Sequence, residues 1–155
     1  GVVTEDVEEL RDHFNFPGMK ILQFAFDNQE ENNYLPPYED ENCIVYTGTH
    51  DNNTTLGWYE EDLLEEDEAD MEEHLDENLE VRHDDIVWDL IELGWQSKAV
   101  MAIAPLQDFL TLGSEARFNT PGTSAGNWQW RYTKDMIDQD LINRIKGVTE
   151  RNNRA

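Results

Sequence analysis

Three short apolar runs, separated by segments with helical spacing, place the strongest constraint on the fold. The runs cover residues 19–26, 43–47 and 99–104. Nearly continuous apolar runs of this length are typical of strands that are covered on both faces, as in parallel sheets. Strands that alternate with helices imply parallel pairing through crossover connections, so the sequence predicts an α/β fold. Three strands cannot close an eight-stranded barrel, which leaves a small open α/β domain or the last part of a (β/α)8 barrel.

Capping residues and breakers predict where several helices begin and end. Thr4 precedes a helical pattern over residues 5–14, and Pro105 opens a short helix over residues 105–110. Thr133 is predicted to cap a final helix whose apolar side extends to Ile145. The last residues, 150–155, are expected to fray, as chain ends commonly do.

The charge balance narrows the classes of partner. The formal net charge is −24, with 35 acidic residues against 11 basic ones. Nucleic acids and anionic membrane surfaces would repel such a chain, so neither is expected as a partner. The acidity could serve the binding of cations or basic proteins. It could also be a solvated surface suited to a salty cytoplasm, which is the interpretation we favour because the acids are spread along the chain and lysine is rare.

The acids are densest in residues 60–92, where apolar residues nevertheless recur at helical spacing. A disordered acidic tail would lack such a stripe, so we expect amphipathic helices with an acidic outer face. We treat residues 1–155 as one unit that contains this acidic helical segment.

Other patterns bear on compartment and cofactors. Cys43 is the single cysteine and stands in an apolar run, so we expect a buried structural thiol. We find no run long enough to span a membrane and no signal peptide, and a cytoplasmic location is expected. His and Cys residues do not cluster with zinc spacing, and neither a calcium loop nor a phosphate loop is evident, so no metal or cofactor is predicted. Because the chain starts at Gly1 and not at Met, we also expect it to be a fragment of a longer protein.

Chemistry-bearing residues follow the second apolar run. His50 and Asp51 stand side by side just after residues 43–47, and a helical pattern starts soon after them. Parallel-strand barrels carry their catalytic residues at this carboxyl end of the strands. The alternative is that Asp51 only caps the next helix, a role that suits aspartate. The dipeptide by itself would favour capping.

Longer motifs favour a functional role for Asp51 over simple capping, because several of them occur together and in a fixed order. They are Lys20–Asp27 (KILQFAFD), Tyr46–Asn52 (YTGTHDN), Pro105–Leu110 (PLQDFL), Gly113–Thr123 (GSEARFNTPGT) and Gly126–Arg131 (GNWQWR). Together they resemble the C-terminal part of the 4-alpha-glucanotransferase family, also called amylomaltases or disproportionating enzymes. The resemblance covers nearly the whole chain and is weakest near residues 60–82. It implies a (β/α)8 barrel in the complete protein, with about three βα units supplied here and the N-terminal part of the barrel as their partner.

The resemblance also implies an activity, namely retaining transfer of alpha-1,4-glucan segments between maltooligosaccharide or alpha-glucan chains. Asp51 matches the carboxylate that stabilises the transition state, and His50 matches its sugar-binding neighbour. The nucleophilic aspartate belongs to an earlier strand and the acid/base glutamate to a segment before Gly1, so the chain is expected to be inactive alone. Alternatives are a related alpha-glucan hydrolase and a noncatalytic glucan-binding domain.

Further residues are candidates for lining the substrate cleft. Phe26 and Asp27 end the first predicted strand on the expected catalytic rim, although Asp27 could equally be a turn residue. Asn119 stands in the turn sequence Asn119–Gly122, and its amide is a candidate contact for a glucose unit. We expect Arg117 and Glu115 to form an ion pair that shapes this loop.

Two tryptophans in the same region invite a similar question. Trp128 and Trp130 are spaced to lie on one side of an extended segment. Sugar stacking is conceivable for both, but we favour core packing of the C-terminal segment, with Arg131 capping carbonyls or pairing with acids.

Overall fold

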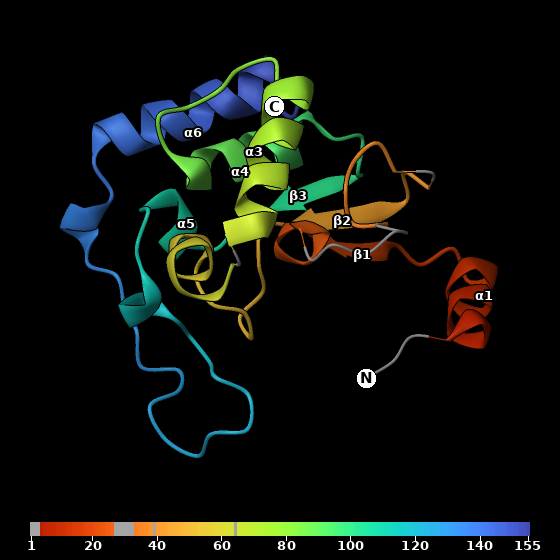
Figure 1. The fold of residues 1–155 in the computed structure, drawn as a ribbon, viewed down its shortest axis with the longest axis horizontal. Helices are drawn as coiled ribbons and strands as arrows, with labels where there is room; N and C mark the ends of the chain where they lie inside the picture. The colour runs from red at the N-terminus through yellow and green to blue at the C-terminus, as the bar shows by residue number, and fades with distance from the viewer. Residues whose placement is uncertain (1–3, 27–32, 39, 64) are drawn as a thin grey trace.

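Three parallel strands form the centre of the molecule (Figure 1). The computed structural model describes residues 4–26, 33–38, 40–63 and 65–155. Strand β1 (Gly18–Ile21) pairs with β2 (Cys43–Tyr46), which pairs with β3 (Met101–Ile103), in the order β1-β2-β3. The register aligns Lys20 with Val45 and Val45 with Ala102. The predicted α/β fold with parallel strands is therefore confirmed.

The described residues form six α-helices, of which α3, α4 and α6 lie together on one side of the sheet (Figure 1). Their bounds are Glu5–His13 for α1, Thr55–Gly57 for α2, Glu65–Asn78 for α3, Ile86–Gln96 for α4, Leu106–Phe109 for α5 and Gln139–Arg151 for α6. Short 3-10 turns occupy Leu22–Phe26, Ser114–Ala116 and Lys134–Met136, and a π turn occupies Trp58–Asp62. None of the helices described is both long and apolar enough to cross a membrane.

One face of the sheet is buried beneath the helices. Cys43 and Val45 are each 1% exposed and belong to the same core cluster as Met71 and Leu75 of α3. Gly94 brings the backbone of α4 close to the sheet, since a methyl group on it would touch Val45 at 3.8 Å. The buried thiol predicted for Cys43 is confirmed, and burial raises its pKa.

The opposite face of the sheet is open in the described chain. Strand residues alternate between faces, so the positions next to Cys43 and Val45 point away from the helices. Through the register, this open face consists of Met19, Ile21, Ile44, Tyr46, Met101 and Ile103. Met19 and Met101 remain 57% and 50% exposed. The expectation that both faces are covered is therefore met on one face only.

The acidic segment forms helices, as predicted, but not all of its acids face outward. Helix α3 presents Met71 and Leu75 to the core, which confirms the apolar stripe. Helix α4 is buried along most of its length, and its Asp89 and Glu92 are each 1% exposed. The prediction of a wholly acidic outer face was wrong for these two residues, because basic partners hold them inside.

Arginines from neighbouring segments neutralise these buried carboxylates. Arg82 Nε donates to Asp89 at 2.8 Å, and the same guanidinium also bonds Glu72 and Asp76 of α3. Arg151 of α6 bonds Glu92 on the other side. Two buried charges are thus paired, which is the usual condition under which such groups are tolerated.

The first predicted strand is shorter than its apolar run suggests. Residues 19–26 were predicted as one strand, but pairing ends at Ile21 and residues 22–26 form a 3-10 turn. Strand β2 itself ends at Tyr46, and beyond it Gln23 N donates to Thr47 O at 3.2 Å while the chain turns away from the strand direction. Apolar character persists through the turn because Leu22, Ala25 and Phe26 are buried.

The C-terminal region also departs from the prediction. Thr133 begins the turn Lys134–Met136, whereas the long helix α6 starts later, with Asp138 as its cap accepting from Leu141 N at 2.8 Å. The end of the chain is tied down, since Arg154 donates to the carbonyl oxygens of Trp95, Ser97 and Ala99. The fraying prediction was wrong because carbonyls at and beyond the end of α4 need donors, and Arg154 supplies them.

Candidate functional site

A short loop at the carboxyl end of β2, residues 48–54, carries His50 and Asp51. Thr54 caps the helix that follows, because its side chain accepts from Gly57 N at 3.1 Å. Asp51 therefore does not cap α2, and the alternative left open by the sequence is excluded. The side chains of His50 and Asp51 are 58% and 51% exposed.

Contacts from a distant loop fix the position of Asp51. Asn119 Nδ2 donates to Asp51 Oδ1 at 2.7 Å, and the Arg117 guanidinium donates to the Asp51 carbonyl oxygen at 2.8 Å. His50 Nε2 lies 3.4 Å from the same Oδ1. The carboxylate is thus oriented on one oxygen by two neighbours while half of the side chain stays accessible.

The predicted role of Arg117 needs correction. Its guanidinium bonds the carbonyl oxygens of Asn119 and Asp51, and no ion pair with Glu115 occurs in the described part of the chain. The Arg117 guanidinium is planar and has several N–H groups, so it can donate to carbonyl oxygens of both loops at once. Arg117 therefore joins the two loops, where the sequence predicted that it shapes only its own.

Internal hydrogen bonds give the His50–Asp51 loop a fixed shape. Asn52 Oδ1 accepts from both the backbone N and the hydroxyl of Thr49, at 2.9 and 2.7 Å. Gly48 has no room for a side chain, because a methyl group there would lie 2.6 Å from Gln23 Nε2. A larger residue here would have to displace the Gln23 amide, which donates to Asn53 O and the Thr55 hydroxyl.

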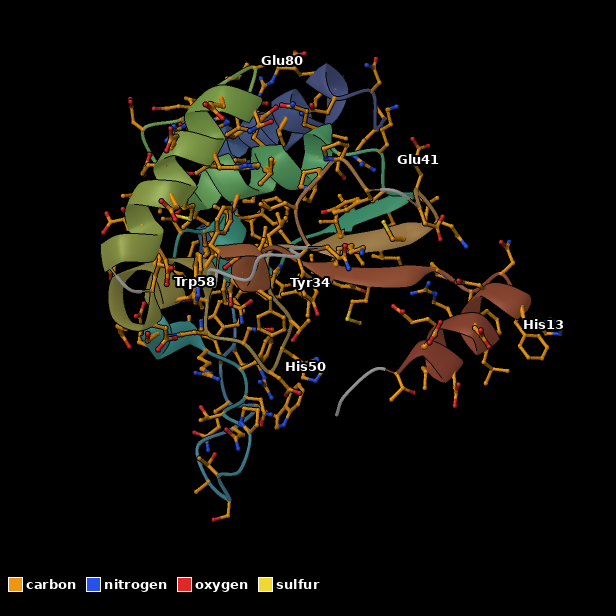
Figure 2. All side chains as sticks on the ribbon, turned by 45° about the vertical axis from the view of Figure 1, so that its right-hand side comes forward. His13, Tyr34, Glu41, His50, Trp58 and Glu80 are labelled. Atoms are coloured by element: carbon orange, nitrogen blue, oxygen red, sulfur yellow. The ribbon has the colours of Figure 1, made fainter. Side chains whose placement is uncertain are left out.

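An aromatic cluster flanks His50 on the side of the extended loop formed by residues 117–132. Figure 2 shows His50 below the sheet, close to this loop. The Trp128 ring centre lies 5.2 Å from that of His50 and 5.8 Å from that of Phe118. Trp128 is 53% exposed, so the prediction that it packs in the core was wrong. Its φ of 61° and the bond from its N to Phe118 O at 2.7 Å turn the indole toward the site.

His50 and Asp51 border an open cleft of about 690 Å³. His50, Asp51 and Asn52 form one wall, and the open face of the sheet forms another through Met19, Ile21, Tyr46 and Ile103. Pro105 and Pro121 also line it. A cleft with apolar walls and a few converging polar groups is the usual form of a small-molecule site.

Three predicted cleft residues do not line the cleft or cannot be placed. Asn119 stands behind Asp51, which it contacts by its hydrogen bond, and is not among the lining residues. Phe26 is 7% exposed in the core, with its ring centre 6.4 Å from that of Trp58. Phe24, which the sequence analysis did not single out, lines the cleft instead and is 42% exposed. The 3-10 turn over residues 22–26 explains this exchange, because it breaks the alternation of a strand. Asp27 lies outside the described residues.

No group of three His, Cys, Asp or Glu side chains in the described ranges is arranged to hold a metal ion. The cleft is lined by the carboxylate of Asp51, the imidazole of His50, the amide of Asn52 and the rings of Phe24 and Tyr46. Such a set suits hydrogen bonding to a polyhydroxylated ligand.

Comparison with known proteins places this site in a family. The family model for 4-alpha-glucanotransferase matches residues 1–137. The 4-alpha-glucanotransferase of Synechocystis sp. is 50% identical over 151 residues, covering 97% of this chain and 29% of the relative. That of Thermus thermophilus is 46% identical over 154 residues, covering 97% of this chain and 31% of the relative.

A solved structure agrees with the sequence comparison. The amylomaltase from Streptococcus agalactiae in complex with acarbose superposes with a TM-score of 0.89 at 32% identity, covering all of this chain and 31% of that one. The chain thus spans about a third of the length of its relatives. On these matches, the chain belongs to the 4-alpha-glucanotransferase family.

Proposed function

We propose that this chain is part of an enzyme that transfers alpha-1,4-glucan segments from one glucan chain to another with retention of configuration. The observation that carries the proposal is the placement of Asp51. Its carboxylate stands at the carboxyl end of a parallel strand, borders an open cleft and is oriented by Asn119 at 2.7 Å. The family relatives named above are 4-alpha-glucanotransferases, and one solved relative holds acarbose.

The chemistry assigned to Asp51 follows from the transition state of retaining transfer. As the glycosidic bond breaks, the sugar ring takes on oxocarbenium character and positive charge. A fixed carboxylate beside that ring stabilises the charge only as it develops, so it lowers the barrier more than it tightens ground-state binding. Hydrogen bonds to a sugar hydroxyl also strengthen in this state. In this proposal the nucleophile and the acid/base residue come from the rest of the enzyme.

His50 and its aromatic neighbours are proposed to hold the sugar against this carboxylate. An imidazole can donate to or accept from a sugar hydroxyl. The exposed indole of Trp128 offers an apolar face beside it for the C–H surface of a glucose unit. Transfer to a sugar hydroxyl also requires that water be kept from the intermediate, and an aromatic wall contributes to that exclusion.

We further propose that the sheet continues as a (β/α)8 barrel of which this chain supplies about the last three βα units. The open face of the sheet is apolar at all six of its positions, yet Met19 and Met101 stay at least half exposed. Strands β1 and β3 each have a free edge among the described residues. A closed barrel would cover the exposed apolar face and would pair the backbone groups of both edge strands.

The test uses the complete gene product that contains this chain, incubated with maltotriose. Transfer produces a ladder of longer maltooligosaccharides together with glucose. Release of glucose and maltose without longer products would indicate a hydrolase, and unchanged maltotriose would indicate a protein that only binds glucans. Either of these results would overturn the proposed transfer activity.

A further inference from the structure

One buried carboxylate holds both ends of the His50–Asp51 loop. Asp108, on α5, is 1% exposed. Its Oδ2 accepts from the hydroxyls of Thr47 and Thr55 at 2.5 and 2.8 Å, and its Oδ1 accepts from Thr55 N at 2.9 Å. Thr47 and Thr55 are the residues that immediately precede and follow loop 48–54. The carboxylate therefore closes the loop at its base.

The protons in this cluster can be assigned from the hydrogen bonds. The Thr55 hydroxyl accepts from Gln23 Nε2 at 3.4 Å, so its own proton is available to Asp108. Asp108 thus accepts from three donors, which are the Thr47 hydroxyl, the Thr55 hydroxyl and Thr55 N. It acts only as an acceptor, as an ionised carboxylate does. Burial raises the pKa of Asp108, while the hydrogen bonds from Thr47 and Thr55 oppose that rise. No Lys, Arg or His forms an ion pair with it in the described ranges, so these donors are its compensation.

The element that carries Asp108 is itself fixed to the core. Phe109 packs between Trp88 and Trp95 of α4, with ring centres 5.8 Å from each. Gln107 is 2% exposed and donates to Ala116 O at 3.1 Å. The position of Asp108 is therefore set by the helical layer and transmitted to the loop through three hydrogen bonds.

We propose that Asp108 is a positioning residue for glucan transfer, acting through Thr47 and Thr55 to hold Asp51 at the cleft. The inference rests on the proposed function, and it adds a residue that does not itself border the cleft. Rates of positioned reactions are sensitive to displacements of about 1 Å, which can cost about a hundredfold. A loop released at its base would shift Asp51 by such amounts while the sugar-binding surface around it remains.

The test compares variants of the complete enzyme on maltotriose. Thr47→Val replaces the buried hydroxyl by a methyl group of similar size, whereas Thr47→Ser keeps the hydroxyl. We expect Thr47→Val to lower kcat about tenfold, equivalent to about 1.4 kcal/mol, with KM within about twofold of wild type. Thr47→Ser should retain kcat within about twofold, because the bond to Asp108 is preserved. Asp108→Asn should lower kcat in the same way as Thr47→Val.

A matched control separates positioning from general destabilisation. Asp89 is another carboxylate that is 1% exposed, but it lies in the helical layer and pairs with Arg82. Asp89→Asn should lower Tm at least as much as Asp108→Asn and leave kcat at wild-type level at 25 °C. The proposal is overturned if Thr47→Val keeps the wild-type kcat, or if kcat follows Tm equally in all four variants. If Asp108→Asn does not fold, the Thr47 pair decides. A wild-type enzyme that shows no transfer refutes the proposed function instead, before any variant is compared.

Discussion

The ring of His50 lies against the indole of Trp128, with their centres 5.2 Å apart. Trp128 reaches this place from the extended loop of residues 117–132 because its backbone adopts a left-handed conformation, with φ at 61°. Non-glycine residues rarely do so, and such strain often marks a functional position. The tryptophan thus adds a broad apolar face next to the imidazole that is proposed to bind sugar.

Trp128→Ala in the complete enzyme should weaken substrate binding. Loss of the indole face is expected to raise KM for maltotriose about tenfold, or about 1.4 kcal/mol. The hydrolysed fraction of the product should also rise, since water gains access beside His50. Tyr132→Ala serves as the control, because Tyr132 is similarly exposed at 55%, whereas the ring in contact with His50 is that of Trp128. Equal KM values for the two variants would contradict a sugar contact at Trp128.

Asn119→Ala should act mainly on kcat. The amide orients Asp51 through a hydrogen bond of 2.7 Å, so its removal lets the carboxylate rotate away from the sugar. A hydrogen bond to a charged group contributes about 1.5–3 kcal/mol, which corresponds to a fall in kcat of about tenfold or more. Steady-state kinetics on maltotriose measure this effect. Asn143→Ala, on the exposed surface of α6, should change nothing, and an Asn119→Ala enzyme with the same kinetics as that control would remove Asn119 from the site.

The contribution of Glu92 to the free energy of unfolding is expected to depend on pH. Burial alone would raise the pKa of Glu92, but hydrogen bonds from Arg151, Asn152 and His83 lower it below its ordinary value. A depressed folded-state pKa contributes stability that is present above the unfolded pKa, about 4.3, and is lost as the pH falls through the folded value. Glu92→Gln in the complete enzyme should therefore lower stability by about 2 kcal/mol at pH 7, with a smaller difference at acidic pH.

Calorimetric Tm values of wild type and variant at pH 7 and below pH 4 provide the measurement. Glu150→Gln is the control, because Glu150 pairs with Lys146 while 57% of its side chain is exposed. Exposed pairs contribute about 0–1 kcal/mol, so this variant should melt close to wild type at both pH values. If the difference in Tm between wild type and Glu92→Gln stays constant with pH, the ionisation of Glu92 is not coupled to folding.

Two glycines should respond in opposite directions to alanine. A methyl group on Gly57 would meet the side chains of Ser114 and Asn53 and would lie 2.9 Å from Ser114 N, so Gly57→Ala should cost about 1–3 kcal/mol. Gly147 lies inside α6 with nothing within 4 Å of a methyl group, so Gly147→Ala should stabilise by about 0.5–1 kcal/mol. The two variants are expected to shift Tm in opposite directions. An unchanged Tm for Gly57→Ala would show that Asn53 and Ser114 move aside at no cost in stability.

Local patterns predicted the features that depend on local chemistry. Residues 43–47 form a strand within one residue of the predicted end, and His50 and Asp51 follow it at the expected edge of the sheet. The helix over residues 106–109 follows Pro105 as expected. Arg131 caps the carbonyls of Trp128 and Trp130, as its position in the motif suggested.

The features that sequence reasoning missed depend on partners far away in the chain. The first strand stops at Ile21, opposite the end of β2 at Tyr46, and the chain then turns although Gln23 N still donates to Thr47 O, which hydrophobicity cannot reveal. Burial of Glu92 depends on Arg151 and Asn152, 59 and 60 residues away, which bond its carboxylate together with His83. Trp128 lies beside His50 through a positive φ that no pattern of apolar residues encodes. Local sequence patterns therefore predicted the helices and strands well, but they did not predict the contacts between residues far apart in the chain.

The most direct test of the account is the turnover number of Asp51→Asn in the complete enzyme with maltotriose. Asparagine keeps the size of the side chain and can still bond Asn119, but it removes the negative charge that is proposed to face the developing cation. We predict that kcat falls by at least about a hundredfold, equivalent to about 3 kcal/mol, while Tm is unchanged. A folded Asp51→Asn enzyme with kcat within twofold of wild type would contradict the proposed role of this carboxylate.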